Sequence, residues 1–386
     1  MRAARGATGG RAGRDDVAVL VLAAGKGTRM RSNLVKVLHP LAGRPMLAYV
    51  LDLASSLRPR RLAVVIGHQA DAVKKAFEKE SRRVAWVLQR EQKGTADAVM
   101  AARGALQGFK GTLVVLYGDV PLLRPITVRA LLGAHKKTEV PVTVLTATVS
   151  DPAGYGRIVR GPDGGIVRIV EEADASPAER SIREINTGIY CMEVPFLFEA
   201  LASVDAENAQ GEYYLTDVIA SCVKRGRRVG SYETSEPERA LGINTRKDLA
   251  AAEAALRAET CDRWMLSGVT IVDPSCTHID QGVRIGRDTR IEPNCGLYGA
   301  TVIGASCHIG PGCVLTDAVL GERVTLGALC VLERTTIENG ASIGPLSYLC
   351  HTPAGRQPSA AGLRSAGLRP LPRPHRRGTG TPRAGS

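Results

Sequence analysis

The sequence predicts an α/β protein in which a doubly wound, Rossmann-like domain is followed by a short parallel β-helix. The first observation is that apolar strand segments alternate with helical segments from Val17 to Asp119. The second is an apolar residue at every sixth position from Ile279 onward. Between these patterns, the segment 245–266 has helical spacing and contains no Gly or Pro. A chain of 386 residues is therefore expected to form two domains joined by a helix.

The first half alternates between apolar runs and amphipathic segments. Strands are expected at 17–22, 61–67, 84–89 and 112–119, and helices at 44–57, 71–79 and 95–106. Further strands with polar tips are expected within 151–159, 169–174 and 184–192. Such alternation is typical of a parallel sheet with helices on both faces. Ligands of these folds bind beyond the carboxyl ends of the strands.

The first strand runs into a glycine-rich turn, which continues to Lys36 in the sequence LAAGKGTRMRSNLVK (22–36). Glycines leave backbone N–H groups open to phosphate oxygens, and Lys26, Arg29 and Lys36 add cations that suit a triphosphate. The spacing fits neither the Walker pattern nor Gly-x-Gly-x-x-Gly, because Met30 stands at the third glycine position. A tight strand-to-helix turn without ligand is the alternative interpretation.

Two later strand ends carry polar residues. Asp119 closes an apolar strand, where a carboxylate is a suitable Mg²⁺ ligand, although it could also only cap the following turn. Gln89 ends another strand, and Gly94 and Thr95 open the next helix. This segment offers hydrogen bonds to a uracil edge, and by itself it is equally a capped helix start. Together with the glycine turn, these residues predict a site at one edge of the sheet.

The second half carries a repeat with a period of six residues. Apolar anchors stand at Ile279, Ile285, Ile291, Leu297, Ile303, Ile309, Leu315, Leu320, Leu326, Leu332, Ile337, Ile343 and Leu349, with two five-residue steps. Gly or an acidic residue follows most anchors. This is the hexapeptide pattern of a parallel β-helix, and it predicts about four coils. We expect a basic tail at 1–16, an α/β domain at 17–248, a linker helix at 249–266, the β-helix at 267–350 and a Pro/Arg/Gly-rich tail at 351–386.

The net charge of +13 does not favour nucleic-acid binding, because it is confined to the ends. Residues 1–14 hold four Arg and residues 351–386 hold seven, so the remainder carries about +2. Both tails lack aromatic residues for base stacking, and their composition predicts disorder. No apolar run is long enough to span a membrane, and no secretory signal is evident.

Nine cysteines, an odd number without a Cys-x-x-Cys pair, favour neither a disulfide framework nor a zinc site. Cys295, Cys307, Cys313 and Cys330 each follow an anchor by four residues. We therefore expect these four to pack as small residues inside or at the corners of the β-helix.

The segment LAAGKGTRM followed by Lys36-Val37-Leu38-His39 resembles the start of the sugar-nucleotide pyrophosphorylases. Residues 17–350 resemble one branch of that family, the bacterial N-acetylglucosamine-1-phosphate uridylyltransferases. The resemblance rests on five segments: DPAGYGRIV, IVEEAD, EINTGIYCM, NAQGEYYLTD (208–217) and GINTRKDL (242–249). The resemblance implies a Mg²⁺-dependent cytoplasmic enzyme that joins UTP and N-acetylglucosamine 1-phosphate. The products are UDP-N-acetylglucosamine, a cell-wall precursor, and pyrophosphate. It also implies that the β-helix is left-handed and forms a homotrimer; whether four coils retain this assembly stays open.

The resemblance also implies roles for individual residues. Arg29, Lys36 and Asp119 would be catalytic, and Asp119 and Asn244 would hold Mg²⁺. Nucleotide and sugar would contact Leu22, Ala23, Ala24, Gly25, Lys36, Gln89, Gly94, Thr95, Tyr117, Gly118, Asp119, Gly156, Glu171, Asn186 and Asn244. Since the attacking phosphate oxygen is already ionised at pH 7, no general base is required.

This chain departs from the family pattern at three places. Val35 replaces the Pro that usually precedes the lysine, which leaves the loop less constrained in φ. The family often has a basic residue shortly after the glutamate, whereas this chain reads Glu171-Glu172-Ala173. After Ile343-Gly344-Pro345 the sequence reads LSYLCHTPAGRQPSAAG instead of an Arg-Pro-Gly segment.

The family segments that carry the acetyl-transfer His, the CoA-binding residues and an Asn-Tyr pair have no counterpart. His351 and His375 are expected to be solvated. We therefore expect a truncation or reading-frame shift and no acetyltransferase activity. The alternatives are a bifunctional enzyme that also acetylates glucosamine 1-phosphate with acetyl-CoA, a relative specific for another base or sugar, and a non-catalytic β-helix scaffold.

Overall fold

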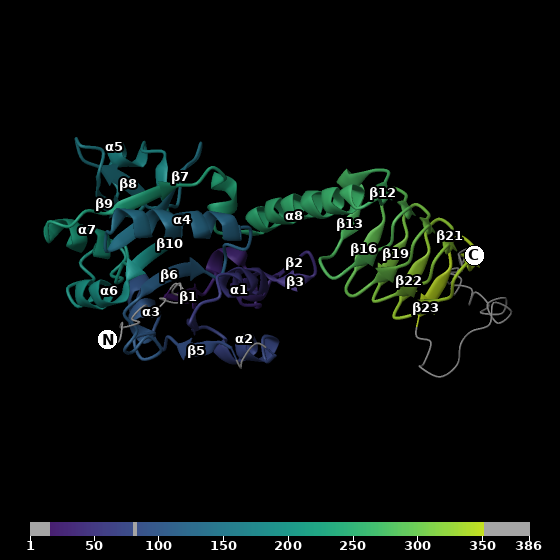
Figure 1. The fold of residues 1–386 in the computed structure, drawn as a ribbon, viewed down its shortest axis with the longest axis horizontal. Coiled ribbons are helices and arrows are strands. Elements are labelled where there is room, and N and C mark those ends of the chain that lie inside the picture. The colour runs from purple at the N-terminus through teal and green to yellow at the C-terminus, as the bar shows by residue number, and fades with distance from the viewer. Residues whose placement is uncertain (1–15, 80–82, 351–386) are drawn as a thin grey trace, which may run out of the picture. The chain divides into compact units, whose positions relative to one another are not determined.

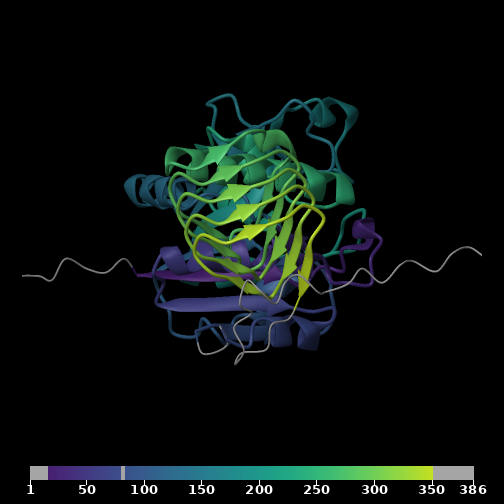
Figure 2. The same cartoon turned by 90° about the vertical axis from the view of Figure 1, so that its right-hand side faces the viewer.

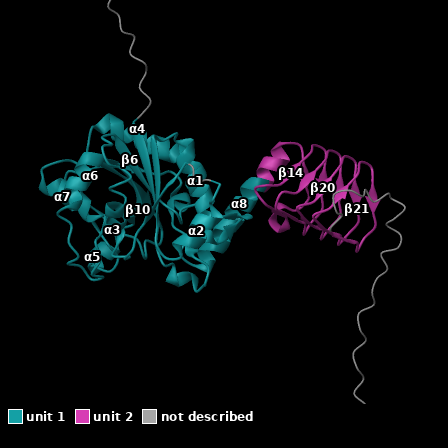
Figure 3. Ribbon diagram, turned by 90° about the horizontal axis from the view of Figure 1, so that it is seen from below, with its two compact units in different colours: residues 1–260 teal, residues 261–386 magenta. Residues whose placement is uncertain are grey.

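The computed structural model describes residues 16–79 and 83–350 in two compact units, 1–260 and 261–386 (Figure 3). The predicted α/β domain and hexapeptide β-helix are both confirmed. The tails predicted at 1–16 and 351–386 lie outside the described residues, apart from Asp16, and so do His351 and His375. None of the described helices is both long and apolar enough to cross a membrane.

Unit 1 is built on a mixed sheet (Figure 1). The main order of its strands is β11-β7-β10-β6-β1-β4-β5. The strands are β1 (Val17–Ala23), β4 (Arg61–Ile66), β5 (Ala85–Leu88), β6 (Thr112–Tyr117), β7 (Val142–Thr148), β8 (Arg157–Arg160), β9 (Ile166–Val170), β10 (Glu184–Glu193) and β11 (Gly230–Glu233). A separate hairpin pairs β2 (Pro40–Leu41) with β3 (Arg44–Pro45). The helices are α1 (Met46–Ser56), α2 (Ala70–Ala76), α3 (Thr95–Ala101), α4 (Pro125–Thr138), α5 (Pro177–Arg180), α6 (Val194–Leu201) and α7 (Asp217–Lys224).

The predicted parallel arrangement is confirmed for β1, β4, β5 and β6, but one central strand of the full sheet runs in the opposite direction. β10 runs antiparallel to both β6 and β7. Its first residue, Glu184, pairs with Thr148, the last residue of β7. The chain therefore leaves the sheet at the end of β7, forms the β8–β9 hairpin and α5, and returns at the same edge. No crossover helix intervenes, so the returning strand must run backwards. Since β7 runs parallel to β6 and β1, this excursion lies at their carboxyl edge.

The two faces of the sheet follow from the alternation of side chains along β1. Val17, Val19 and Val21 pack with α1, α2 and α4 on one face. Ala18, Leu20 and Leu22 pack with α3, α6 and α7 on the other. Every side chain of β1 is buried, as expected for a central strand of a doubly wound fold.

Helix α3 ends at Ala101, five residues before the predicted end at Leu106. From Ala102 the backbone continues as tight turns, in which Arg103 N–H bonds Met100 C=O (3.0 Å) and Gln107 N–H bonds Gly104 C=O (3.3 Å). Gly104 has low helix propensity and lies in the middle of this segment, which is sufficient reason for the helix to end early.

Helix α8 (Arg246–Leu266) contributes side chains to both units. Ala252 and Leu256 belong to an apolar cluster of unit 1 that contains Met46. Cys261, fully buried, belongs to the core of unit 2. The unit boundary falls between Thr260 and Cys261, within the helix.

Unit 2 is a parallel β-helix with three sheets (Figure 2). One sheet contains β12 (Thr270–Ile271), β15 (Arg290–Ile291), β18 (His308–Ile309), β21 (Thr325–Leu326) and β24 (Ser342–Ile343). The second contains β13 (His278–Ile279), β16 (Gly296–Tyr298), β19 (Val314–Thr316), β22 (Val331–Glu333) and β25 (Tyr348–Cys350). The third contains β14 (Arg284–Ile285), β17 (Val302–Ile303), β20 (Val319–Leu320) and β23 (Thr336–Ile337).

The six-residue anchors point into the β-helix. All are buried except Leu349 in the last described strand, which is partly buried. Both five-residue steps lead into the third sheet, at Leu320 and Ile337, so one corner of two successive coils is shorter by a residue. The anchors therefore stay in register. Cys295, Cys307, Cys313 and Cys330 are also buried in this core.

Candidate active site

A cavity of about 620 Å³ opens at the carboxyl edge of the unit 1 sheet. The sequence-predicted residues that line it are Leu22, Ala23, Ala24, Gly25, Arg29, Lys36, Gln89, Gly94, Thr95, Tyr117, Asp119, Gly156, Glu171, Asn186 and Asn244. Lys26 lines it as well. Gly118 does not: its N–H donates to Leu22 C=O (2.9 Å), and an added Cβ would lie 3.0 Å from Ala23 Cβ. Gly118 therefore packs behind Leu22 and Ala23, which line the cavity.

The turn after β1 requires a glycine at Gly27. Its φ of 63° is left-handed, and an added Cβ would lie 2.6 Å from Lys36 Cβ. Gly27 thus allows the lysine stem to pack directly against the turn. Gly25, by contrast, has open space around it. The backbone of the turn is therefore accessible from the cavity at Gly25, whereas at Gly27 it packs against Lys36.

Val35, the replacement for the family proline, adopts φ −59° at the start of the short 3₁₀ helix Lys36–Leu38. This φ is within the range that proline fixes covalently. The Val35 side chain is 2% exposed and its carbonyl accepts from Leu38 N–H (3.0 Å). Burial and this turn therefore hold the backbone before Lys36 in a proline-like conformation.

Lys36, Asp119 and Asn244 form the polar centre of the cavity. Lys36 Nζ forms an ion pair with Asp119 Oδ2 and donates to Asn244 Oδ1 (2.7 Å). Arg29 Nη2 also donates to Asn244 Oδ1 (2.9 Å). The carboxylate and amide oxygens thus converge on one cationic nitrogen. An anionic and a neutral oxygen at one point fit a hard divalent cation that fills its other positions with water and phosphate.

Backbone contacts hold Asp119 and Asn244 next to each other. Ile243 N–H donates to Asp119 C=O (2.8 Å), which fastens the segment before Asn244 to the end of β6. The Asp248 carboxylate accepts from the N–H groups of Asn244 (2.9 Å) and Thr245 (2.8 Å) at the start of α8. The proximity of the two backbones therefore does not depend on Lys36.

A second group of residues lies around the start of α3. Gln89 is 4% exposed, and its Nε2 donates to Gly94 C=O (3.1 Å) and Asp97 Oδ2 (2.7 Å). Within the described residues, its Oε1 accepts no hydrogen bond. Gly94 has φ 116° and faces the Tyr213 backbone, where an added Cβ would lie 2.4 Å from Tyr213 O. Leu215 N–H donates to Thr95 Oγ1 (2.9 Å), so the segment NAQGEYYLTD is fastened to this helix start.

The hairpin β8–β9 and β10 supply the third group. Glu171 accepts from Thr216 Oγ1 (3.0 Å), and burial raises its pKa despite this bond. Gly156 lies close to Glu171 and accepts through its C=O from Asn186 N–H (2.8 Å). Asn186 Oδ1 in turn accepts from Gly188 N–H (3.0 Å). These residues come from three different strands or strand ends, which explains why their proximity is not visible in the sequence.

A buried arginine lies behind this third group. Arg157 is 1% exposed; it pairs with Glu172 Oε2 (2.7 Å) and donates to Tyr155 C=O. Glu172 Oε2 also accepts from Gly154 N–H (3.1 Å). Gly154 and Tyr155 line the cavity, so the Arg157–Glu172 pair fixes a segment of its wall. Ala173, the departure noted above, is exposed and lies outside the lining.

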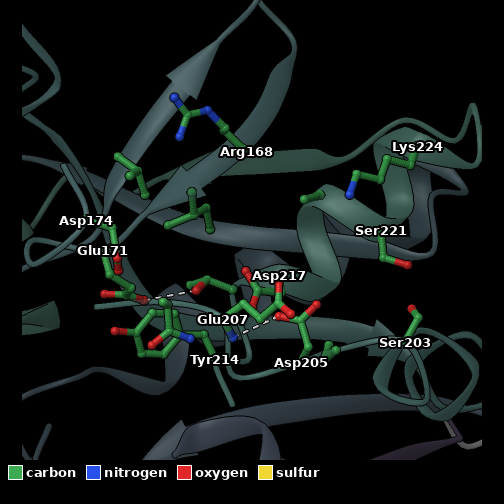
Figure 4. Close-up of a pocket in the computed structure, with 16 residues that line it drawn as sticks. Arg168, Glu171, Asp174, Ser203, Asp205, Glu207, Tyr214, Asp217, Ser221 and Lys224 are labelled. Carbon is green, nitrogen blue, oxygen red and sulfur yellow. Dashed lines mark hydrogen bonds between the residues drawn. The ribbon is translucent and has the colours of Figure 1, made fainter. Parts of the chain in front are cut away.

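Sequence reasoning missed a second cavity of about 450 Å³, shown in Figure 4. It shares Glu171 and Thr216 with the first cavity. Its other acidic lining residues are Asp174, Asp205, Glu207 and Asp217, with Arg168 and Lys224 as the cations. Burial also raises the pKa of Asp217. Asp174 and Asp217 add to the pKa rise of Glu171 by charge repulsion, so the second cavity affects the titration of a residue in the first.

Several further residues line the first cavity without having been singled out. They are Gly27, Thr28, Val37, Gln92, Ala98, Val120, Gly154, Tyr155, Thr187, Gly188, Tyr190, Glu212, Leu215, Thr216 and Gly242. Most stand within one or two positions of a predicted residue. Thr216 and Glu212 lie in NAQGEYYLTD, so this segment was the feature of the sequence from which they could have been predicted.

Comparison with known proteins supports the architecture. Residues 19–219 match the model of the MobA-like NTP transferase domain, and residues 282–317 match the bacterial transferase hexapeptide model with six repeats. A solved structure of UDP-glucose pyrophosphorylase complexed with UDP-glucose is 19% identical with a TM-score of 0.52, covering 64% of this chain and 99% of its own. At that identity the likeness shows the fold alone.

Curated relatives are much more similar in sequence. The bifunctional protein GlmU of Pelobacter propionicus is 46% identical over 335 residues, which is 87% of this chain and 73% of the relative. That of Brevibacillus brevis is 47% identical over 330 residues, which is 86% of this chain and 71% of the relative. Both alignments extend well beyond the α/β unit. This chain therefore belongs to the GlmU family and is a nucleotidyltransferase.

Proposed function

We propose that this protein transfers UMP from UTP to N-acetylglucosamine 1-phosphate, giving UDP-N-acetylglucosamine and pyrophosphate, with Mg²⁺ as the cofactor. The observation that supports this most is the convergence of Lys36, Asp119 and Asn244 beside the turn after β1. The relatives named GlmU support the same assignment. The cavity volume of about 620 Å³ is in the range of a small-molecule site.

The reaction requires two anions to meet, and the residues present suit that task. The sugar phosphate provides an ionised oxygen that attacks the α-phosphorus of UTP, so no residue has to remove a proton. Lys36 and Arg29 offset the charge of the phosphates, and the turn after β1 contributes backbone close to them. Asp119 and Asn244 would hold the divalent cation, which when bound neutralises phosphate oxygens as a Lewis acid.

The two ends of the cavity differ in a way that suits the two ends of the product. At the α3 end, Gln89 Oε1 is the acceptor for the N3–H of a uracil ring, because Nε2 is already occupied. At the β8–β9 end, Glu171 and Asn186 offer acceptors and donors for sugar hydroxyl and amide groups. The phosphates would then lie between them, next to Lys36 and Asp119.

Pyrophosphate release from UTP tests the proposal. N-acetylglucosamine 1-phosphate, glucosamine 1-phosphate and glucose 1-phosphate are compared as acceptors, and dTTP is compared with UTP. We expect release with UTP and N-acetylglucosamine 1-phosphate to exceed every other pair, and to stop when EDTA is added. A preference for another sugar or base would replace the substrate assignment. No release with any pair would favour the non-catalytic scaffold.

Acetyl transfer and assembly are tested separately. We propose that the 386-residue chain does not acetylate glucosamine 1-phosphate, because its sequence after Pro345 departs from the family segments to which the resemblance assigns acetyl transfer. Release of CoA from acetyl-CoA would contradict this. We also propose a cytoplasmic homotrimer formed through the β-helix. Light scattering coupled to size exclusion measures the assembly, and a monomeric mass would overturn it.

A further inference from the structure

The Lys36 ammonium lies at the point where the proposed metal ligands converge. Its Nζ contacts Asp119 Oδ2 and lies 2.7 Å from Asn244 Oδ1. The side chains of Lys36 and Asp119 are only 11% and 20% exposed, so this contact is largely shielded from water. The cluster thus contains a cation of its own, supplied by the protein.

A divalent cation bound to these two oxygens cannot share them with the ammonium. Mg²⁺ requires oxygens at about 2.0–2.1 Å, whereas Lys36 Nζ already lies within hydrogen-bonding distance of both. The two cations would also repel each other strongly in a shielded site. We therefore propose that Lys36 and the divalent cation exclude each other at Asp119 and Asn244. The metal then binds tightly only when nucleotide phosphates draw Lys36 away, a conclusion that rests on the proposed function.

The structure provides the parts that such an exchange needs. A Cβ added at Gly27 would lie 2.6 Å from Lys36 Cβ and 3.3 Å from its Cγ and Cδ, so the stem of Lys36 runs close to the turn. The exchange then requires rotation only near the ammonium end of this flexible side chain. Asp119 and Asn244 stay adjacent without Lys36, because Ile243 N–H and Asp248 hold their backbones. The turn that carries Lys26 and Arg29 lines the same cavity, where phosphates would receive the released ammonium.

Lys26 is the matched control. It lines the same cavity and carries the same charge. Within the described residues, it forms no hydrogen bond or ion pair with Asp119 or Asn244. Replacing either lysine removes one positive charge from the cavity. Only replacement of Lys36 frees Asp119 Oδ2 and removes the lysine hydrogen bond to Asn244 Oδ1, which then keeps the hydrogen bond from Arg29. Any general electrostatic effect on metal binding therefore appears in both variants, and competition for the ligands appears in one.

The test measures Mn²⁺ binding by electron paramagnetic resonance without nucleotide, using the wild type, Lys36→Met and Lys26→Met. We expect Lys36→Met to bind Mn²⁺ at least about tenfold more tightly than the wild type, since two charge-assisted hydrogen bonds no longer compete. Lys26→Met should stay within about threefold. Adding UTP without sugar phosphate should tighten binding to the wild type and reduce its difference from Lys36→Met.

An unchanged or weaker Mn²⁺ affinity in Lys36→Met would overturn the proposal, and so would an equal gain in Lys26→Met. If Lys36→Met does not fold, amine labelling of the wild type decides, with the labelled peptides quantified by mass spectrometry. Mn²⁺ should then accelerate labelling of Lys36 and not of Lys26; an unchanged Lys36 rate would also overturn the proposal. Neither measurement requires turnover, so its failure is distinct from failure to make the UDP-sugar.

Discussion

Two buried side chains of unit 2 bond the backbone of the neighbouring coil, whereas three buried polar side chains of unit 1 line the cavity at one edge of the sheet. Thr289 Oγ1 donates to Gly304 C=O (2.8 Å) and Cys313 Sγ to Gly327 C=O (3.1 Å), each a residue of the next coil. In unit 1, Lys36, Gln89 and Asn186 are also buried, but they line the cavity. Polar burial therefore stabilises unit 2 and builds a binding site in unit 1.

The largest expected effect comes from breaking the unit 1 cluster. Asp119→Asn removes the charged oxygen that Lys36 contacts and that the proposed metal needs. We expect the rate of pyrophosphate release to fall by about 10³-fold, a size seen for loss of one strong electrostatic group in an active site. The control is Asp163→Asn, at an exposed turn where the carboxylate accepts from Gly165 N–H and from no other group in the described part of the chain. Comparable losses in both variants, or retained activity in Asp119→Asn, would contradict the site.

A change in the β-helix core should affect stability and leave chemistry intact. Ile309 is fully buried, and Ile309→Ala should lower the free energy of unfolding of unit 2 by about 2–5 kcal/mol. Pyrophosphate release below the melting temperature should be unchanged, because the cavity is lined by unit 1 residues alone. Val319→Ala, on the outward position of the same β-helix with 42% exposure, is the matched control. Calorimetry and the release assay, run together, separate the two effects.

The difference between the repeat of unit 2 and the site of unit 1 also explains how much of each could be predicted from the sequence. The β-helix was predictable almost residue by residue, because a repeat of six translates directly into one inward anchor per face. Local patterns predicted the site of unit 1 in the turn after the first strand and at strand ends such as Gln89 and Asp119. The family resemblance supplied Glu171, Asn186 and Asn244. Arg157 and the second cavity were missed. Their positions depend on the antiparallel return of β10, which no local pattern encodes and which brings the β8–β9 hairpin to the cavity edge.

Arg157 offers a test of whether that hairpin positions substrate. Arg157→Lys keeps the charge but cannot pair with Glu172 and reach the Tyr155 carbonyl in the same way. We expect KM for the sugar phosphate to rise about tenfold, with KM for UTP nearly unchanged, because Gly154 and Tyr155 lie at the proposed sugar end. Arg160→Lys on the same strand, where Arg160 pairs with Glu184 at the surface, is the control. Equal effects on both KM values would assign Arg157 a general structural role.

The smallest expected effect concerns two adjacent carboxylates, Glu171 and Glu172, with opposite pKa shifts. Burial raises the pKa of Glu171, whereas the hydrogen bond from Arg157 lowers the pKa of Glu172. The native state therefore holds the Glu171 proton more tightly than the unfolded chain does. Its contribution to stability is present at low pH and is lost as pH rises through the raised pKa. For Glu172 the stabilising contribution is present near neutral pH and is lost as pH falls through the lowered pKa.

Substitution by glutamine should remove the contribution of each carboxyl group to the pH dependence of stability. Relative to wild type, Glu171→Gln should raise Tm at pH 7–8 by about 2–4 °C, as about 1 kcal/mol does for a domain of this size, and the gain should shrink toward acid pH. The Gln side chain still accepts from Thr216 through its Oε1, so the hydrogen bond is retained. Glu172→Gln should lower Tm at pH 7–8, and this loss should also shrink toward acid pH. If both variants shifted Tm in the same direction, burial of Glu171 would not explain its raised pKa. The proposed influence of the second cavity on the Glu171 pKa would then be wrong as well.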